Sequence, residues 1–230
     1  MPDFLANILS EEGQWYTTEN YLQHEPGSLY EYSNIGSTLA AYALEQATGV
    51  SYAEYTTQHI LSPLGMSSSG WSLDDINLNN HTTLYTNPAS PLPKYSLVTY
   101  PDGGLITSVN DLSKFQTELI KGKLGVGTLL SRESYNEIFT EQLNGSHLPD
   151  RDEDDAYDDE YNSGIFMGFT PKGYIGHTGG DPGVASFMFF KPETNVGRIL
   201  TINTRISSQE GVDQFYAIWN TLEKYEALIQ

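Results

Sequence analysis

The first part of the chain shows helical periodicity. From Gly36 onward, apolar residues recur at the spacing of one helix face, and Gly49 stands where a helix-ending glycine is expected. That face consists of Leu39, Ala40, Ala43, Leu44 and Ala47. Ser51 with Glu54 three residues later has the pattern of a capping box, which predicts a second helix reaching about Leu61.

Residues 67–104 form a long connecting region that is rich in Ser, Asn, Thr and Pro and has no clear period. Connections of this length are usually functional or carry short irregular elements. Ser108 and Asp111 then repeat the capping-box pattern and predict another helix. Its apolar face is Leu112, Phe115, Leu119 and Ile120. A short helix after Ser131 is predicted to turn Tyr135, Ile138 and Phe139 inward.

The last third of the chain changes to the pattern of strands. The predicted strands are Ser163–Phe169, Tyr174–His177, Val184–Phe190 and Val196–Thr204, with a turn over Lys191–Asn195. Ser207 and Glu210 predict the start of a final helix. The residues expected to pack on the sheet are Val212, Phe215, Trp219 and Leu222. We therefore predict an α+β fold, with a helical subdomain over residues 1–160 and antiparallel strands with a C-terminal helix over residues 161–230.

Composition excludes several function classes. The 230 residues include no cysteine, so disulfides, thiolate nucleophiles and iron–sulfur clusters are excluded. Thirty acidic residues against eleven basic ones give a net charge of −19, which argues against a nucleic-acid partner. No run of about 18 apolar residues occurs, so we predict no membrane span. The first fifteen residues lack the basic and apolar parts of a signal peptide.

An acidic loop stands out at residues 150–160, with eight carboxylates and one arginine. A calcium-binding EF-hand loop needs glycine at its sixth position, but counting from Asp150 that position holds Asp155. We interpret the segment as a solvated loop. No His-Glu-x-x-His or other familiar ligand spacing is present, so neither a metal nor a cofactor is predicted.

Tyr32-Ser33-Asn34 is the first candidate for chemistry. A tyrosine and an asparagine two residues apart on an extended segment can point the same way. The phenol can relay a proton while the amide positions a carbonyl substrate. Taken alone, the triplet is better explained as a structural aromatic turn.

Gly176-His177-Thr178-Gly179-Gly180 is the second candidate, on a predicted strand. Glycines weaken a strand but are tolerated where a ligand or another backbone comes close. His177 can supply a proton or hydrogen bond, and the Gly180 N–H can face a developing oxyanion. The alternative is a bulged strand. Together, in this order, the two motifs are more specific than either alone.

With these motifs in place, the sequence resembles the serine β-lactamase and penicillin-binding-protein-like superfamily, most of all its class C branch. The resemblance rests on Pro26–Asn34 (PGSLYEYSN), Gly49, Ile60–Met66 (ILSPLGM), Pro101–Phe115 and the His177-Thr178-Gly179 strand. It extends from about Pro26 to the end of the chain. Besides β-lactamases, the class C branch includes esterases, D-aminopeptidases and D,D-peptidases.

The resemblance implies a cleft between a helical and an α/β subdomain, where a Ser-x-x-Lys serine forms an acyl-enzyme with a small ester, amide or peptide substrate. Tyr32 matches the proton-relay tyrosine, and Asn34 matches the substrate-positioning asparagine. His177 matches the lysine or histidine of the strand motif. Thr178, Gly179 and Gly180 match the substrate-binding edge of that strand. The family also implies a periplasmic or extracellular location.

The Ser-x-x-Lys motif is absent, because no serine has a lysine three residues later. The nearest pattern, Thr221-Leu222-Glu223-Lys224, lies on the predicted terminal helix. We expect this chain to be the carboxy-terminal portion of a hydrolase, inactive alone, with exposed apolar surface covered by homodimer formation or strand exchange. The alternative is a non-catalytic family member that binds a peptide or cell-wall ligand.

His177 also bears on the substrate. A lysine at this position provides a fixed cation for a substrate carboxylate, whereas a histidine side chain is mostly neutral near pH 7. The sequence therefore predicts a preference for esters or peptides over carboxylated β-lactams.

Overall fold

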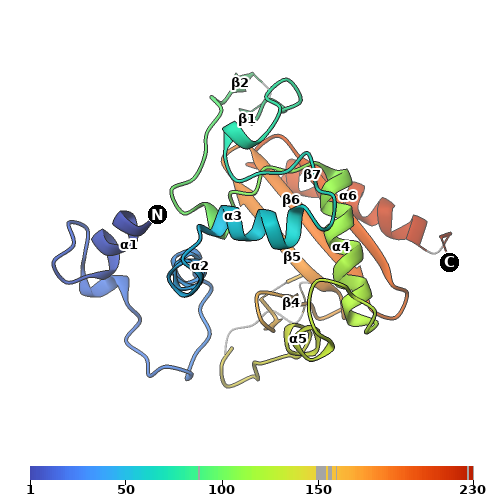
Figure 1. Ribbon diagram of the computed structural model, residues 1–230. Helices are drawn as coiled ribbons and strands as arrows, with labels where there is room; N and C mark the ends of the chain where they lie inside the picture. Colours follow the sequence, from blue (N-terminus) through green and yellow to red (C-terminus); the bar gives the residue numbers. More distant parts are fainter. Residues whose placement is uncertain (88, 149–153, 155–156, 159, 227, 230) are drawn as a thin grey trace.

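The computed structural model describes residues 1–87, 89–148, 154, 157–158, 160–226 and 228–229. Most of the acidic loop predicted at 150–160 lies outside the described residues. The chain forms an α+β fold in which helices cover a five-stranded antiparallel sheet (Figure 1). None of its helices, within the described part of the chain, combines the length and the apolar character that a bilayer crossing requires.

The predicted helices are present, with bounds close to those expected. They are α2 (Asn34–Thr48), α3 (Tyr52–Thr56) with its π-helical continuation η2 (Thr57–Leu61), α4 (Val109–Lys123), α5 (Arg132–Ile138) and α6 (Gln209–Glu226). A further helix, α1 (Pro2–Leu9), opens the chain. Local chemistry explains the ends of α2: the Ser33 hydroxyl accepts from the Gly36 N–H at 2.9 Å, and Gly49 adopts a left-handed φ of 70°.

The apolar face of α2 does not face the core. Leu39 is 45% exposed, and Ala40, Ala43 and Ala47 are exposed as well. The helix instead turns Thr38 inward, against the turn η4 (Tyr100–Asp102). A large share of this helix's apolar surface therefore has no cover within the described residues.

The connecting region 67–104 carries only short elements, as expected from its lack of period. They are η3 (Leu73–Asp75), β1 (Tyr85–Asn87), β2 (Ser90–Pro91) and η4. Its first residues are bound to α4 through the Asp111 side chain. Further along the region, Tyr85 forms an isolated parallel bridge with Thr204.

The main sheet has the order β3-β4-β5-β6-β7. Its strands are β3 (Asn162–Ser163), β4 (Gly168–Phe169), β5 (Ile175–Asp181), β6 (Val184–Lys191) and β7 (Val196–Ile202). One prediction was wrong: Ser163–Phe169 is not a single strand but a hairpin, β3 and β4. The chain reverses there because Gly164 donates to the Met167 carbonyl at 2.8 Å and Phe166 adopts a positive φ of 55°.

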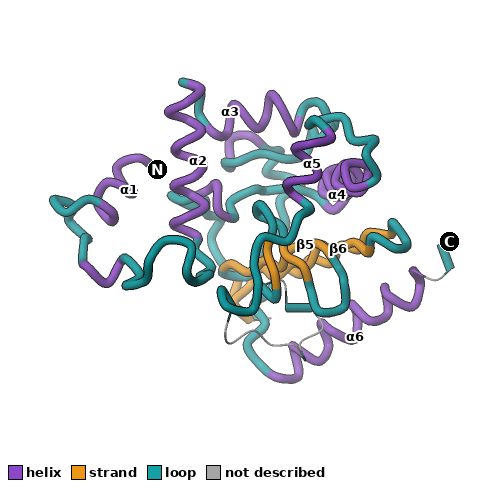
Figure 2. The backbone as a smooth tube through the Cα atoms, turned by 90° about the horizontal axis from the view of Figure 1, so that it is seen from below, coloured by secondary structure: helices purple, strands orange, loops and turns teal. Residues whose placement is uncertain are grey.

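The sheet lies between two helical layers, with α4 and α5 on one face and α6 on the other (Figure 2). Successive residues of β6 alternate between them: Phe190 packs with the α4 and α5 layer, and Phe189 packs with α6. Trp219 of α6 is fully buried on that side. The expected packing of the last helix on the sheet is confirmed, although its first turn is capped by Ser208 and not by Ser207.

A close approach fixes α4 on the sheet. The Gln116 amide of α4 is buried and donates to the Phe189 carbonyl at 2.9 Å and to the Arg198 carbonyl at 3.3 Å. Gly197 makes room for it, because a Cβ at that position would lie 2.2 Å from Gln116 Oε1. Thus α4, from the first predicted subdomain, contacts the sheet of the second directly. The boundary at residue 160 stays a prediction.

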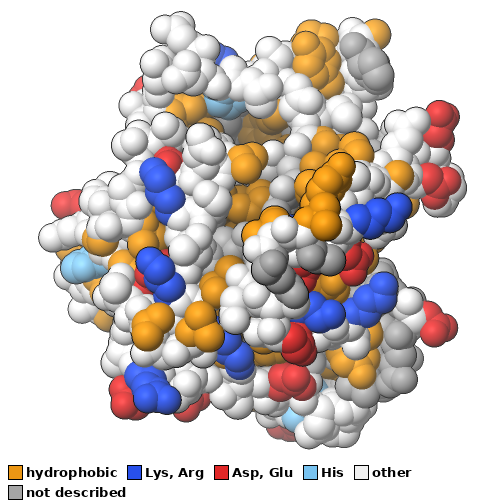
Figure 3. Space-filling view, turned by 90° about the vertical axis from the view of Figure 1, so that its right-hand side faces the viewer, with side chains coloured by type: hydrophobic (Ala, Val, Ile, Leu, Met, Phe, Trp, Pro, Cys, Tyr) orange, Lys and Arg blue, Asp and Glu red, His pale blue; other side chains and the backbone are white. Residues whose placement is uncertain are grey.

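Apolar side chains are exposed at several places. They include Leu228 (74% exposed), Ile229 (72%) and Leu39 (45%). Figure 3, which views the molecule from the right of Figure 1, shows hydrophobic side chains across the middle of that face, with lysines and arginines among them. The expected homodimer or strand exchange stays a prediction.

Candidate functional site

A cavity of about 1230 Å³ opens where α2 begins, beside β5. The connecting region, the first residues of α4 and the ends of β6 and β7 supply most of the rest of its lining. All six residues singled out from the sequence line it, namely Tyr32, Asn34, His177, Thr178, Gly179 and Gly180. The cavity exceeds the usual volume of a small-ligand site, which is roughly 300–1000 Å³.

Tyr32 and His177 meet at this cavity although 145 positions separate them in the chain. Their ring centroids lie 5.9 Å apart, with the ring planes inclined by 49°. Tyr32, which is 46% exposed, precedes the capping residue Ser33, and Asn34 is the first residue of α2. The cap that starts the helix therefore also fixes where the tyrosine and the asparagine stand.

The glycine-rich motif forms a regular strand, so the bulge interpretation is wrong. β5 pairs with β6 in continuous register, from Ile175 opposite Phe190 to Asp181 opposite Val184. On its other side β5 pairs with β4 only at Ile175 and Gly176. Beyond that point no second described strand covers β5, so its remaining length forms a wall of the cavity.

The glycines of β5 leave space that side chains would fill. A Cβ at Gly179 would lie 2.6 Å from the Ser186 hydroxyl, whereas a Cβ at Gly180 would meet nothing within 4 Å. The absence of a side chain at Gly180 is therefore not needed for packing, and it leaves the backbone there open to the cavity. The expectation that the Gly180 N–H faces a developing oxyanion stays a prediction. His177 Nδ1 contacts the carbonyl of the next residue, Thr178.

The cavity lining is braced from two sides. The fully buried Thr38 hydroxyl donates to Asp102 Oδ2 at 3.2 Å, which ties α2 to the turn at residues 100–102. Asp111, at the start of α4, accepts from the Ser68 N–H at 2.7 Å and from the Ser69 hydroxyl at 3.0 Å. These bonds hold the connecting region against the two helices that border the cavity.

Asp111 remains ionised because of its partners. Burial acts to raise the pKa of this carboxyl, but the hydrogen bonds from Lys114, Ser68 and Ser69 outweigh burial and lower the pKa below its ordinary value. The Lys114 ammonium lies 2.8 Å from Asp111 Oδ1 and also donates to the Gly65 carbonyl. This lysine is therefore engaged in structure and does not line the cavity.

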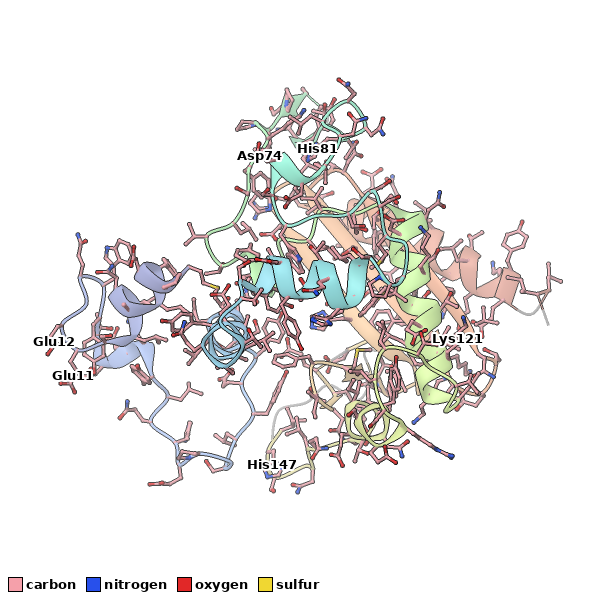
Figure 4. The ribbon with its side chains drawn as sticks, viewed as in Figure 1. Glu11, Glu12, Asp74, His81, Lys121 and His147 are labelled. Atoms are coloured by element: carbon pink, nitrogen blue, oxygen red, sulfur yellow. The ribbon has the colours of Figure 1, made fainter. Side chains whose placement is uncertain are left out.

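Sequence reasoning missed several lining residues that bear charge or ionise. They are His81, Tyr95, Asp102, Glu160 and Asp181. His81 comes from the connecting region and lies close to β1 in Figure 4. Burial, and next the negative charge of Asp102, raise the pKa of the Asp181 carboxyl. The signal available for Asp181 was its place directly after the glycines, but nothing in the sequence indicated that Asp102 lies near it.

The chemistry of the lining is that of hydroxyls, amides and carboxylates. No lysine or arginine lies among the described lining residues, so none of the lining serines is paired there with a cation that would activate it. Within the described residues, no group of three or more His, Cys, Asp or Glu side chains is placed to hold a metal ion. The arrangement can bind a carbonyl compound and move a proton at Tyr32 or His177.

Comparisons with known proteins show similarity to one family and to several individual proteins. A family model described as Beta-lactamase matches residues 12–223. Unguisins hydrolase ungD' of Aspergillus campestris is 27% identical over 202 residues, which are 82% of this chain and 36% of that protein. Protein flp of Staphylococcus aureus is 30% identical over 102 residues, which are 41% of this chain and 20% of that protein.

Two solved structures share the fold. The octameric penicillin-binding protein homologue from Pyrococcus abyssi has a TM-score of 0.67 at 20% identity, covering 96% of this chain and 52% of its own. A D-amino acid amidase from Ochrobactrum anthropi has a TM-score of 0.64 at 21% identity, covering 87% and 60%. The chain thus spans a fifth to about a third of these curated relatives and little more than half of these solved structures.

Replacing Asp111 by asparagine tests the brace. We expect the Asp111→Asn variant to lose about 2 kcal/mol of the free energy of unfolding at pH 7, because the ionised acceptor is lost. Since the folded-state pKa is depressed, the stabilisation is present above the ordinary carboxyl pKa and is lost as pH falls through the folded value. The stability difference between the two proteins should therefore begin to shrink below about pH 4 and disappear as the pH falls below the depressed pKa of Asp111.

Urea unfolding at neutral and acidic pH measures this difference. The exposed Asp74→Asn variant is the matched control and should unfold like the unmodified chain at both pH values. A deficit for Asp111→Asn that stays the same size in acid would show that its charge does not matter.

Proposed function

Because this chain belongs to the beta-lactamase family, we propose that its cavity is the substrate site of an acyl-transfer serine hydrolase whose nucleophile is not part of these 230 residues. One observation carries the proposal. The rings of Tyr32 and His177 stand 5.9 Å apart at a cavity that the Asn34 side chain and the glycine edge of β5 also line.

In this proposal each residue has a separate role. A serine hydroxyl attacks the carbonyl of a small ester, amide or peptide and forms an acyl-enzyme, which water then hydrolyses. Tyr32 relays the proton between the serine and the leaving group. Asn34 positions the substrate, and the Gly180 N–H stabilises the oxyanion at the edge that Thr178 and Gly179 extend. His177 donates a hydrogen bond or proton.

The names of two relatives support hydrolysis at a carbonyl carbon. One is a hydrolase, ungD', and another is a D-amino acid amidase. By family resemblance the protein acts in the periplasm or outside the cell. A homodimer or strand exchange would cover the exposed apolar face of α2. The octameric state of the Pyrococcus abyssi homologue is a precedent for assembly in this fold.

A second candidate function is ligand binding without hydrolysis. It is favoured by one observation: the sequence contains no Ser-x-x-Lys, and the described cavity lining contains no lysine. Such a protein would hold a peptide or cell-wall fragment along β5. The gene upstream of the Met1 codon distinguishes the two. An in-frame Ser-x-x-Lys supports the hydrolase, and a stop codon followed by a ribosome-binding site supports the binding protein.

The first prediction on activity concerns this chain by itself. Incubated with a fluorescent penicillin or a fluorophosphonate probe, the 230-residue protein should form no covalent adduct, because the sequence contains no Ser-x-x-Lys and the described cavity lining contains no lysine that could activate a serine. Intact-protein mass spectrometry and gel fluorescence measure labelling, with an active penicillin-binding protein as the positive control. A labelled serine would show that the chain contains its own nucleophile.

The role of Tyr32 is tested in the protein that carries the upstream nucleophile. There, Tyr32→Phe should lower kcat for an ester substrate by about 100-fold or more, with little change in KM, because proton transfer is lost while binding remains. Tyr42→Phe, on α2 but outside the cavity lining, is the control and should keep full activity. Equal rates for the two variants would remove Tyr32 from the mechanism.

Substrate preference is tested with the same protein. Position 177 holds a histidine and not a lysine, which would provide a fixed cation for a substrate carboxylate. The value of kcat/KM for simple esters or peptides should therefore exceed that for carboxylated β-lactams. Replacing His177 by lysine should reduce the difference in kcat/KM between the two substrate classes. Faster hydrolysis of the β-lactams by the unmodified protein would contradict this expectation.

A further inference from the structure

The charge of the cavity has a single sign. Its described lining includes the carboxylates of Asp102, Glu160 and Asp181, and it includes no lysine or arginine. A cleft lined by charges of one sign concentrates their field and raises the local concentration of ligands of the opposite charge. An anionic substrate is disfavoured here, and a cationic one is favoured.

Asp181 occupies a defined position relative to the predicted reaction centre. His177, Gly179 and Asp181 alternate along β5 and therefore belong to the same face of the strand. Gly179 precedes Asp181 by two residues, which is about 6.7 Å of strand. A substrate carbonyl at the Gly179–Gly180 edge would thus lie near the Asp181 carboxylate. The gap between them is about the length that one short amino acyl group of the substrate and the aspartate side chain span together.

Asp102 lies beside Asp181, although it comes from a different segment. A Cβ on the neighbouring Gly103 would lie 3.6 Å from Asp181 Oδ2, so the Asp181 carboxylate packs against this turn. Thr38 fixes Asp102 from behind through the 3.2 Å hydrogen bond. The two carboxylates repel each other, and burial with this repulsion raises the pKa of Asp181. A cation between them relieves that repulsion.

An aromatic side chain lines the same region. The Tyr95 hydroxyl donates to the carbonyl of Pro182 at 2.9 Å, which fixes the ring next to the end of β5. Burial and the charge of Asp181 raise the pKa of the Tyr95 phenol, which keeps the ring neutral. Aromatic faces and carboxylates together are the usual surroundings of organic ammonium groups. A metal ion fits less well, since no ligand group of three or more was found among the described residues.

We propose that the cavity selects substrates with a protonated amino group close to the scissile carbonyl, and that Asp102 and Asp181 bind that ammonium group. The proposal rests on the proposed function for the identity of the reacting group. Recognition of the amine is nevertheless a binding property, so it can be measured on this chain without any turnover.

The experiment compares two ligands that share a phenyl ring and a carboxamide, of which only one carries a charged amino group. Phenylalanine amide carries the ammonium group, and N-acetylphenylalanine amide keeps the ring and the carbonyl but is neutral. Isothermal titration calorimetry at pH 6.5 and low salt, with both enantiomers of each, should show about tenfold tighter binding of the amine, with the advantage shrinking in high salt. Equal affinities, or no detectable binding of the amine, would overturn the proposal.

Variants locate the effect. Asp181→Asn and Asp102→Asn should each weaken binding of phenylalanine amide about fivefold to tenfold and leave binding of the N-acetyl compound within twofold, which also shows that the cavity is intact. Asp213→Asn, an exposed change on α6 outside the lining, should alter neither affinity. Unchanged amine affinity in both cavity variants, or equal losses for the two ligands, would overturn the assignment. Neither result would affect the acyl-transfer proposal, which the labelling and Tyr32 experiments test separately.

Discussion

The pairing of β5 with β6 is the constraint on which the cavity depends. At its start β5 is a core strand, with Ile175 buried opposite Phe190, and at its end it is a cavity wall. Side chains along β5 alternate between the two faces of the sheet, and the register with β6 is continuous. The packing of Ile175 in the core therefore determines the face on which His177 lies. A slip of one residue would exchange the two faces and remove the imidazole from Tyr32.

Polar bonds join other segments that border the cavity to one another. Thr38 connects α2 to the turn at Asp102, and Asp111 connects α4 to the connecting region. Buried hydrogen bonds of this kind are directional, so they fix the relative placement of the segments that they join. This explains how a long region without periodic structure can form a defined lining.

Local sequence signals predicted the α-helices other than α1 and two of the main strands, because capping serines, Gly49 and alternating apolar residues act within a few positions. These local signals failed where contacts between distant parts of the chain determine the structure. The segment Ser163–Phe169 contains a chain reversal at Phe166, whose positive φ is uncommon for an aromatic residue. The six candidate residues were found because they lie in two short motifs. Asp102 and Asp181 were missed because only folding brings them together.

The contact between Gln116 and Gly197 has a consequence for the variation this fold can accept. The long amide occupies the space of a missing methyl group, so any side chain at position 197 collides with it. A smaller residue at position 116 would in turn leave two strand carbonyls without their donor. Homologous sequences should therefore change these two positions together, and a single exchange should survive only with a compensating one nearby.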